Sequence, residues 1–326
     1  MRMKIFFTVI LITGLVLISC KEEPFSPKTD FVERLILTCL IDCESDFQSA
    51  TLTSSYTVDG FNPLENALDP SIEGADIRIW YEDTVYTLRD TTTTREDTSR
   101  YFSPEKFYYV KSFRPQGNKL LEIEAVLPDG RKLVSSTITP SPQSFFFGDG
   151  DQIIPPSNGA LILNDFNVYW TFIGDGEGLL FVPRLFIIYT KLENGVQIEY
   201  TKEVPQDYIQ QGEEFLPLFP VGTKRNLVKY KTSAIDRVMT EISEGDPNKQ
   251  NYTIKYALIQ LFVLDKNLSA YYGALQLVSD GFSVKVDASE YTNIEGGRGV
   301  FGSFLQRTYE IYILDDYILS FGYKIF

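Results

Sequence analysis

Apolar and polar residues alternate with a period of two along much of the first half of the chain. The apolar positions of one parity recur in three segments: Leu35, Leu37, Cys39, Ile41 and Cys43, then Ala75, Ile77, Ile79 and Tyr81, then Leu121, Ile123, Ala125 and Leu127. This alternation, rich in β-branched and aromatic residues, predicts strands. Asp129-Gly130 lies between two such segments and predicts a hairpin. The polar stretch 88–100 is expected to form a long, mobile hairpin loop.

The second half shows the same pattern after a break at Pro140-Ser-Pro142, which cannot continue a strand ladder. Strands are predicted over 168–173, 184–190, 196–201, 252–264 and 309–326. The second and third are joined through Asn194-Gly195. Helical spacing from Leu268 to Val278 predicts one helix, which ends at Asp280-Gly281. We therefore expect a mainly β protein. An immunoglobulin-like β-sandwich (31–142) is followed by a second β-sandwich-like domain with one helix (143–326).

The N-terminus carries an export signal. Arg2 and Lys4 precede an apolar run over 5–18, which is too short for the roughly 20 residues that span a bilayer. The ending Leu17-Ile18-Ser19-Cys20 resembles the lipobox of bacterial lipoproteins, which implies cleavage after residue 19 and acylation of Cys20. The alternatives are an ordinary cleaved signal with a chance cysteine and, less favoured, a retained transmembrane helix.

Residues 20–30 are expected to form an extended tether between the lipid and the fold, because they contain two prolines, five charges and few apolar groups. Within the tether, Lys21, Glu22 and Glu23 resemble the basic-then-acidic surface export signal of Bacteroidota lipoproteins. A solvated linker without a signal is the alternative for these three residues.

Charge and composition exclude several classes of function. Without residues 1–19, 28 basic residues face 44 acidic ones, a formal charge of −16, which repels nucleic acid and anionic headgroups. The chain has no histidine, so triads, Cys-His pairs and histidine zinc sites are absent from it. A carboxylate pair for glycoside hydrolysis is still open, yet no pair stands out among 44 acids. We expect no enzymatic activity and no cofactor.

Three smaller motifs each have a structural explanation beside a functional one. Gly297 to Gly302 matches the dinucleotide-binding pattern, but no βαβ unit surrounds it, so we expect a folded loop with close backbone approach or positive φ. Weak calcium candidates occur in two acidic glycine turns, which turn chemistry also explains: Asp149, Asp151, Asp175 and Glu177. Cys39 and Cys43 are expected to be buried thiols, with a strained bridge as the alternative if a turn falls at Asp42.

Four segments together resemble a known family: 34–41, 52–56, 74–79 and 291–302. They are similar to the Bacteroidota lipoproteins grouped as the domain-of-unknown-function family numbered 4249. The most specific part is a loop with the residues Asn293, Ile294, Glu295, Gly296, Gly297, Gly299, Val300, Phe301 and Gly302. The resemblance implies an outer-membrane lipoprotein, often encoded beside TonB-dependent receptors, and it carries over no catalytic residue.

The resulting expectation is a lipid-anchored outer-membrane protein that faces the cell exterior. It would act as a non-enzymatic binding or accessory subunit of a β-barrel partner such as a TonB-dependent transporter. The alternative is a structural subunit of an outer-membrane protein assembly or export machine.

Overall fold

The computed structural model describes residues 31–58, 62, 66, 68–148, 150–171, 178–212, 214–276 and 291–326. Contacts divide the chain into a short unit, residues 1–33, and a compact unit, residues 34–326. The described residues are mainly β, with 53% strand and 10% helix, so the mainly β expectation is confirmed. No helix in the described ranges is long and apolar enough to cross a membrane.

The long strands of the first half are β1 (Leu35–Asp42), β2 (Phe47–Ser54), β3 (Asp76–Tyr81), β4 (Thr84–Thr93), β5 (Glu105–Lys111), β6 (Leu120–Val126) and β7 (Lys132–Ile138). Four two-residue strands follow: β8 (Phe145–Phe146), β9 (Ile153–Ile154), β10 (Ser157–Asn158) and β11 (Leu161–Ile162). The later strands are β12 (Asp165–Trp170), β13 (Leu180–Glu193), β14 (Val196–Val204), β15 (Asp207–Gln211), β16 (Glu214–Leu218), β17 (Leu227–Lys231), β18 (Tyr252–Leu264), β19 (Arg298–Ile313) and β20 (Lys324–Ile325). The helices are α2 (Thr232–Glu241), α3 (Lys266–Gln276), α4 (Asp315–Ser320) and the 3-10 turn η2 (Lys249–Asn251).

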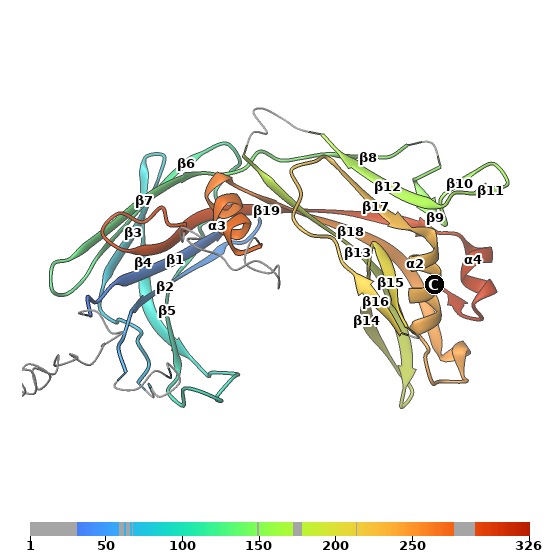
Figure 1. Cartoon of the computed structure of the whole chain (residues 1–326), viewed down its shortest axis with the longest axis horizontal. Coiled ribbons are helices and arrows are strands. Elements are labelled where there is room, and N and C mark those ends of the chain that lie inside the picture. The colour runs from blue at the N-terminus through green and yellow to red at the C-terminus, as the bar shows by residue number, and fades with distance from the viewer. Residues whose placement is uncertain are drawn as a thin grey trace, which may run out of the picture. The chain divides into compact units, whose positions relative to one another are not determined.

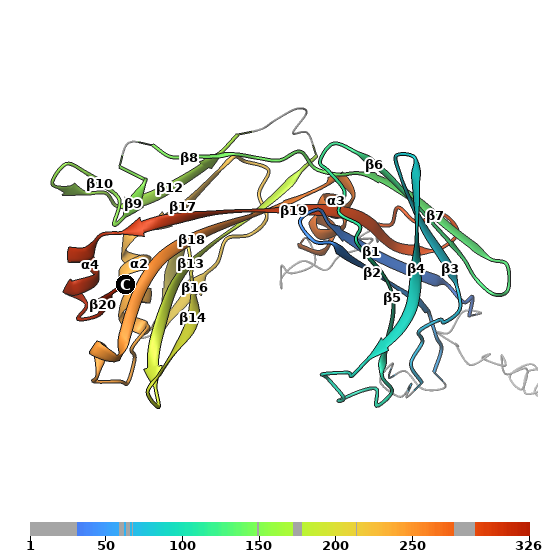
Figure 2. The ribbon, with the colours of Figure 1, turned by 180° about the vertical axis from the view of Figure 1, so that it is seen from behind.

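One large mixed sheet connects both halves of the chain (Figures 1 and 2). Its strand order is β14-β13-β18-β19-β1-β2-β5-β4-β3-β6-β7, and β20 and β9 pair with β18 and β19 outside this path. Strand β19 makes the connection. Its first part pairs in parallel with β1, from Arg298 to Phe304, and its later part pairs antiparallel with β18, from Phe304 to Ile311. The smaller sheets are β17-β12-β8, β10-β11 and β15-β16.

Two main hydrophobic clusters lie on this framework. The first collects the inward positions of β1, β3 and β6, and it also takes in Ile294 and Phe301 from the C-terminal part of the chain. The second lies among β12, β13, β17, β18 and the helix α2. Helix α2 buries Ala234, Ile235 and Val238, whose spacing places them on one face toward that core.

Several predicted elements are confirmed, and others differ. Strand β18 has the predicted bounds, β13 and β14 are joined at Asn194-Gly195, and α3 covers most of the predicted helix. Two helices, α2 and α4, were not predicted. The predicted closing strand over 309–326 is interrupted after Ile313, because Asp315 and Asp316 start the short helix α4; strand structure returns only in β20. The stretch 88–100 is only partly a loop, since β4 continues to Thr93 by pairing with β5.

The two later cysteines are free and buried, as the sequence predicts. Burial raises the pKa of both Cys39 and Cys43 to about 12. A thiol with so high a pKa is almost entirely protonated at neutral pH, so neither cysteine is a reactive nucleophile. The domain boundary near residue 142 stays a prediction.

Candidate functional site: the glycine-rich strand and an apolar groove

The predicted site residues fall partly outside the described ranges. Cys20, Lys21, Glu22 and Glu23 lie outside them, as do Asp149, Asp175 and Glu177. The remaining calcium candidate, Asp151, is buried and accepts hydrogen bonds from the backbone and side-chain nitrogens of Asn167, at 2.9 to 3.4 Å. Among the described residues, no group of three or more His, Cys, Asp or Glu is arranged to hold a metal ion.

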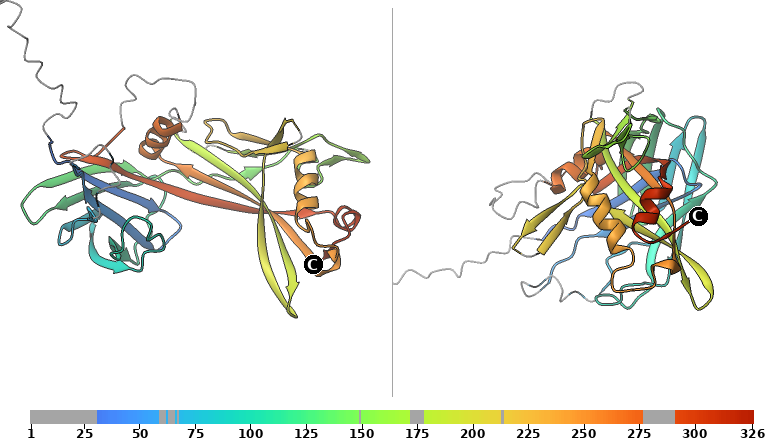
Figure 3. Two further views of the ribbon diagram at one scale, coloured as in Figure 1. Left: turned by 60° about the horizontal axis from the view of Figure 1, so that its bottom comes forward. Right: turned by 90° about the vertical axis from the view of Figure 1, so that its right-hand side faces the viewer.

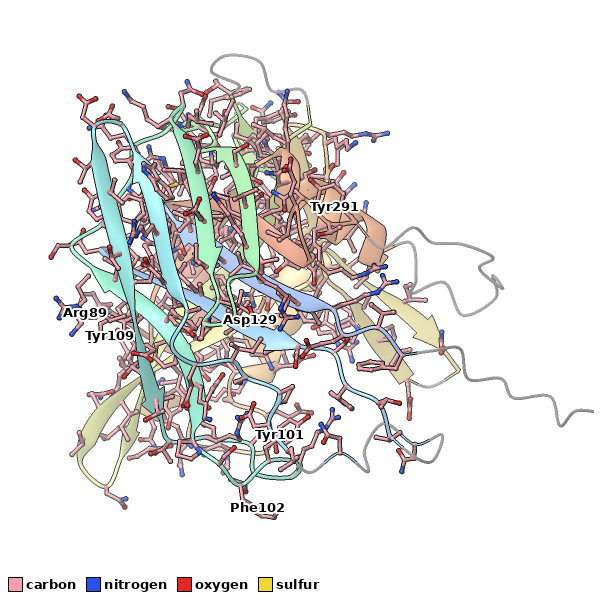
Figure 4. All side chains as sticks on the ribbon, turned by 90° about the vertical axis from the view of Figure 1, so that its left-hand side faces the viewer. Arg89, Tyr101, Phe102, Tyr109, Asp129 and Tyr291 are labelled. Carbon is pink, nitrogen blue, oxygen red and sulfur yellow. The ribbon has the colours of Figure 1, made fainter. Side chains whose placement is uncertain are left out.

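The segment from Asn293 to Gly302 runs between β7 and β1. Glu295 exchanges backbone hydrogen bonds with Val134 of β7, at 2.9 and 3.2 Å. Asn293 closes the segment on itself, because its side chain bonds both the N–H and the C=O of Phe301, at 3.0 and 2.7 Å. Tyr291, which precedes the segment by two residues (Figure 4), donates its hydroxyl hydrogen to Asn267 of α3 at 2.9 Å. The segment is therefore held to both strands and to the helix.

Its glycines stand where backbone or side chains approach closely. A Cβ on Gly296 would lie 2.4 Å from the carbonyl oxygen of Lys132, and one on Gly297 would lie 2.7 Å from that of Leu35. Gly299 has a φ of +109°, and its Cβ would lie 2.0 Å from the carbonyl oxygen of Leu37. A Cβ on Gly302 would lie 2.5 Å from Cγ of Leu268, where α3 packs on β19. Gly299 and Gly302 thus lie in β19, and Gly296 and Gly297 directly precede it. A dinucleotide fingerprint instead needs a strand, a turn and a helix.

Asp265 joins the same elements by hydrogen bonds. It is 1% exposed, and its carboxylate accepts bonds from Thr137 of β7 (2.5 Å), from the backbone and hydroxyl of Ser303 in β19 (2.5 and 2.7 Å), and from the N–H of Leu268 in α3 (2.8 Å). Burial raises the pKa of this carboxyl, although all four bonds act to lower it. Desolvation is therefore the larger effect.

Asp265→Asn is expected to destabilise the fold by about 2–4 kcal/mol, because an amide cannot accept all the bonds that the carboxylate receives. The pKa of Asp265 is higher in the folded than in the unfolded chain, so its contribution is fully present below the unfolded pKa and is lost as pH rises through the folded pKa. In urea unfolding, the free energy of unfolding of the parent should therefore exceed that of the variant by more at pH 4 than at pH 7. A difference that grows with pH would mean that the hydrogen bonds outweigh desolvation.

An apolar groove of about 600 Å³ lies beside this junction. Its floor is one face of four adjacent strands and consists of Leu180 and Val182 of β13, Phe262 and Leu264 of β18, Phe304 of β19 and Leu40 of β1. Leu268 and Tyr272 of α3 line it as well, as does the segment from Pro220 to Gly222 that follows the β15-β16 hairpin. Figure 3 shows α3 and this hairpin on the same side of the sheet.

Comparison with protein families identifies the chain. Residues 22–310 match the family model described as Domain of unknown function (DUF4249). The chain belongs to this family. No curated protein matches it. In this DUF4249 chain the matched region contains the glycine segment, Asp265 and every residue that lines the groove, while α4 and β20 lie beyond it.

The groove of the DUF4249 chain offers contacts for binding more than groups for catalysis. Among the described residues, its lining has one charged side chain, Arg184, whose guanidinium bonds both carboxylate oxygens of Glu203 at 2.9 and 2.6 Å and lies over the ring of Phe186. Sequence reasoning missed the groove. A signal was present, because the end of β18, 261–264, is apolar at every position and so predicts a strand with apolar groups on both faces.

Proposed function

We propose that the protein is a lipid-anchored outer-membrane lipoprotein that acts as a non-enzymatic binding or accessory subunit of a β-barrel partner, such as a TonB-dependent transporter. The apolar groove is the observation that supports this role. In the part of the lining that the structure describes, the charged group Arg184 is already ion-paired, and no carboxylate pair is present for acid–base work. The exposed apolar side chains Phe215 and Leu216 belong to the β15-β16 hairpin that precedes the lining segment in the chain, and Val221 of that segment is exposed as well. An apolar surface of this kind is typical of an interaction site.

A pull-down tests the partner. The parent, purified with its lipid from gently solubilised membranes, is expected to retain a β-barrel protein, because a shared membrane and a docking surface both favour association. Substitution of the exposed Val221 and Leu216 by Glu should reduce the amount retained, since a charge would have to be buried in the interface. Recovery of several envelope proteins in fixed ratio, unaffected by these substitutions, would instead support the structural-subunit alternative.

Cys20→Ser is expected to give a protein without acyl chains that leaves the membrane fraction. Each buried methylene of an acyl chain contributes about 0.8 kcal/mol, and two or more chains anchor a folded body stably. Metabolic labelling with a fatty-acid probe, followed by fractionation, measures both effects. Equal labelling of parent and variant would refute acylation at this cysteine.

Exposure on the outer face follows from the Lys21-Glu22-Glu23 segment if it acts as an export signal. Replacement of these three residues by alanine should keep the protein on the periplasmic side, where protease added to whole cells cannot cleave it. The melting temperature should not change, since a solvated tether contributes little to stability. A parent that is itself protected would place the protein on the periplasmic side.

The finer description of the fold that we propose is an immunoglobulin-like sandwich followed by a second sandwich-like unit. Strand β4 supports the first, because its residues 84–88 pair with β3 and its residues 89–93 pair with β5, so that the strand changes its partner midway along its length. Arg89 and Tyr109, which are cross-strand neighbours in the second pairing, are marked in Figure 4. The second unit is supported by the β17-β12-β8 sheet, whose Phe166 and Trp170 share a core with β13 and β18.

A further inference from the structure

The groove floor is an apolar sheet face with space above it. Val182, Phe262, Phe304 and Leu40 are only half-buried there, whereas the opposite face of the same strands packs into the two main cores. A volume of about 600 Å³ is within the range of small-molecule sites, which bury most of a ligand's surface against apolar side chains. A ligand with an extended apolar body would remove this floor from water.

Three basic residues lie close in sequence to residues that line the groove, although the chain as a whole carries −14. Lys224 and Arg225 are exposed and follow Gly222 of the lining by two and three residues. Lys266 stands between the lining residues Leu264 and Leu268. None of these three cations takes part in an ion pair within the described chain.

Two charged residues close to the floor, Arg184 and Asp265, are arranged so that an anion could bind nearby. Arg184 uses Nε and one terminal nitrogen on Glu203, so its other terminal nitrogen retains donors that point to no recorded acceptor. Asp265, the acidic residue next to the lining residue Leu264, is buried and its oxygens are occupied by four donors. Both of these acidic residues, Glu203 and Asp265, thus already have donors that compensate their charge.

We propose that this groove binds a single-chain amphiphile with an anionic head, its acyl chain on the floor between β13 and β1 and its carboxylate or phosphate at the basic rim. This inference deepens the proposed function and rests on it, because it names the ligand class of a binding subunit. The apolar floor contributes binding free energy in proportion to the length of acyl chain that it buries. The basic rim favours a negatively charged head group over a neutral one.

Titration calorimetry on the mature chain with Cys20→Ser tests the proposal, with each amphiphile kept below its micelle concentration. Laurate and dodecyl phosphate are expected to bind at one per chain. Removal of methylenes from the alkyl chain should weaken binding by about two- to fourfold per methylene. Dodecyl maltoside, which has the same chain and no charge, should bind at least about tenfold more weakly. Inorganic phosphate should not bind measurably, which separates an amphiphile site from a phosphate site.

Two kinds of variant locate the site. Val182→Trp fills the floor and should reduce laurate affinity at least about tenfold. The double change Lys224→Glu and Arg225→Glu affects exposed cations without ion-pair partners, so the fold should persist while laurate affinity falls and maltoside affinity does not. Lys324→Glu is the matched control, since β20 pairs with Thr253 and Ile254 of β18, roughly 30 Å along the strand from Phe262.

The outcomes separate this inference from the proposed function. Laurate that binds no more tightly than dodecyl maltoside, or equally well to parent and Val182→Trp, would overturn the amphiphile site. If a β-barrel protein is still retained by the parent in that case, the proposed function stands without it. If laurate binds and the variants weaken its binding as expected, but the parent retains no β-barrel protein, the ligand class is supported and the β-barrel partner is refuted.

Discussion

Gly299→Ala is expected to lower the free energy of unfolding by about 3–5 kcal/mol. Two costs add at this position. A φ of +109° is strained for any residue with a Cβ, and that Cβ would lie 2.0 Å from the carbonyl oxygen of Leu37, so the β1-β19 ladder must shift. Urea unfolding followed by circular dichroism measures the change.

Gly130→Ala is the matched control for this substitution. Gly130 also has a positive φ, +88°, but nothing lies within 4 Å of its added Cβ. The control should therefore cost only about 1 kcal/mol, the contribution of backbone strain alone. Similar losses at both positions would show that the close approach of β19 to β1 has no energetic importance.

A fragment of residues 31–142 is expected not to fold cooperatively on its own. In the intact chain, seven residues of β19 pair with β1, and Phe301 and Ile294 are buried in the core of this region. Loss of two such side chains removes about 3–6 kcal/mol of burial, which is comparable to the whole stability of a typical domain. The exposed edge of β1 would also invite aggregation.

The fragment should regain a cooperative thermal transition when residues 291–306 are appended to it through a short Gly-Ser linker. Glu295 pairs with Val134 in antiparallel register, so the segment starts near the end of β7 and a short linker suffices. The same fusion with Phe301→Ser is the control and should melt at a lower temperature. Equal melting of the bare fragment and the fusion would show that residues 31–142 form an independent domain.

Helices and strands that are determined by a few neighbouring residues could be predicted well. Strand β18 and the β13-β14 hairpin follow from a long β-rich run and from Asn194-Gly195, both of which act over a few residues. Helix α2 was predictable in principle, because Ala234, Ile235, Val238 and Met239 have helical spacing. Helix α4 has only six residues, too few for periodicity to show.

The candidate site was predictable only in part. Glycines at 296, 297, 299 and 302 indicated close approach, which is what the structure has, but the approaching atoms belong to β1, β7 and α3, far away in sequence. The role of Asp265 was hidden for the same reason, since its donors come from Thr137, Ser303 and Leu268. Nothing in the residues next to Asp265 in the sequence distinguishes this buried carboxylate from the other acidic residues among the 44 in the chain.

The sequence by itself determined the mainly β class, most long strands, the free thiols and the family, because alternation, turn dipeptides and the glycine motif are properties of neighbouring residues. Only the tertiary structure decided that β19 pairs with both β1 and β18 and thereby places the groove across four strands. Strand pairing at this separation depends on which faces and edges are left open once the rest of the chain has packed, and alternation along one strand does not encode its partner.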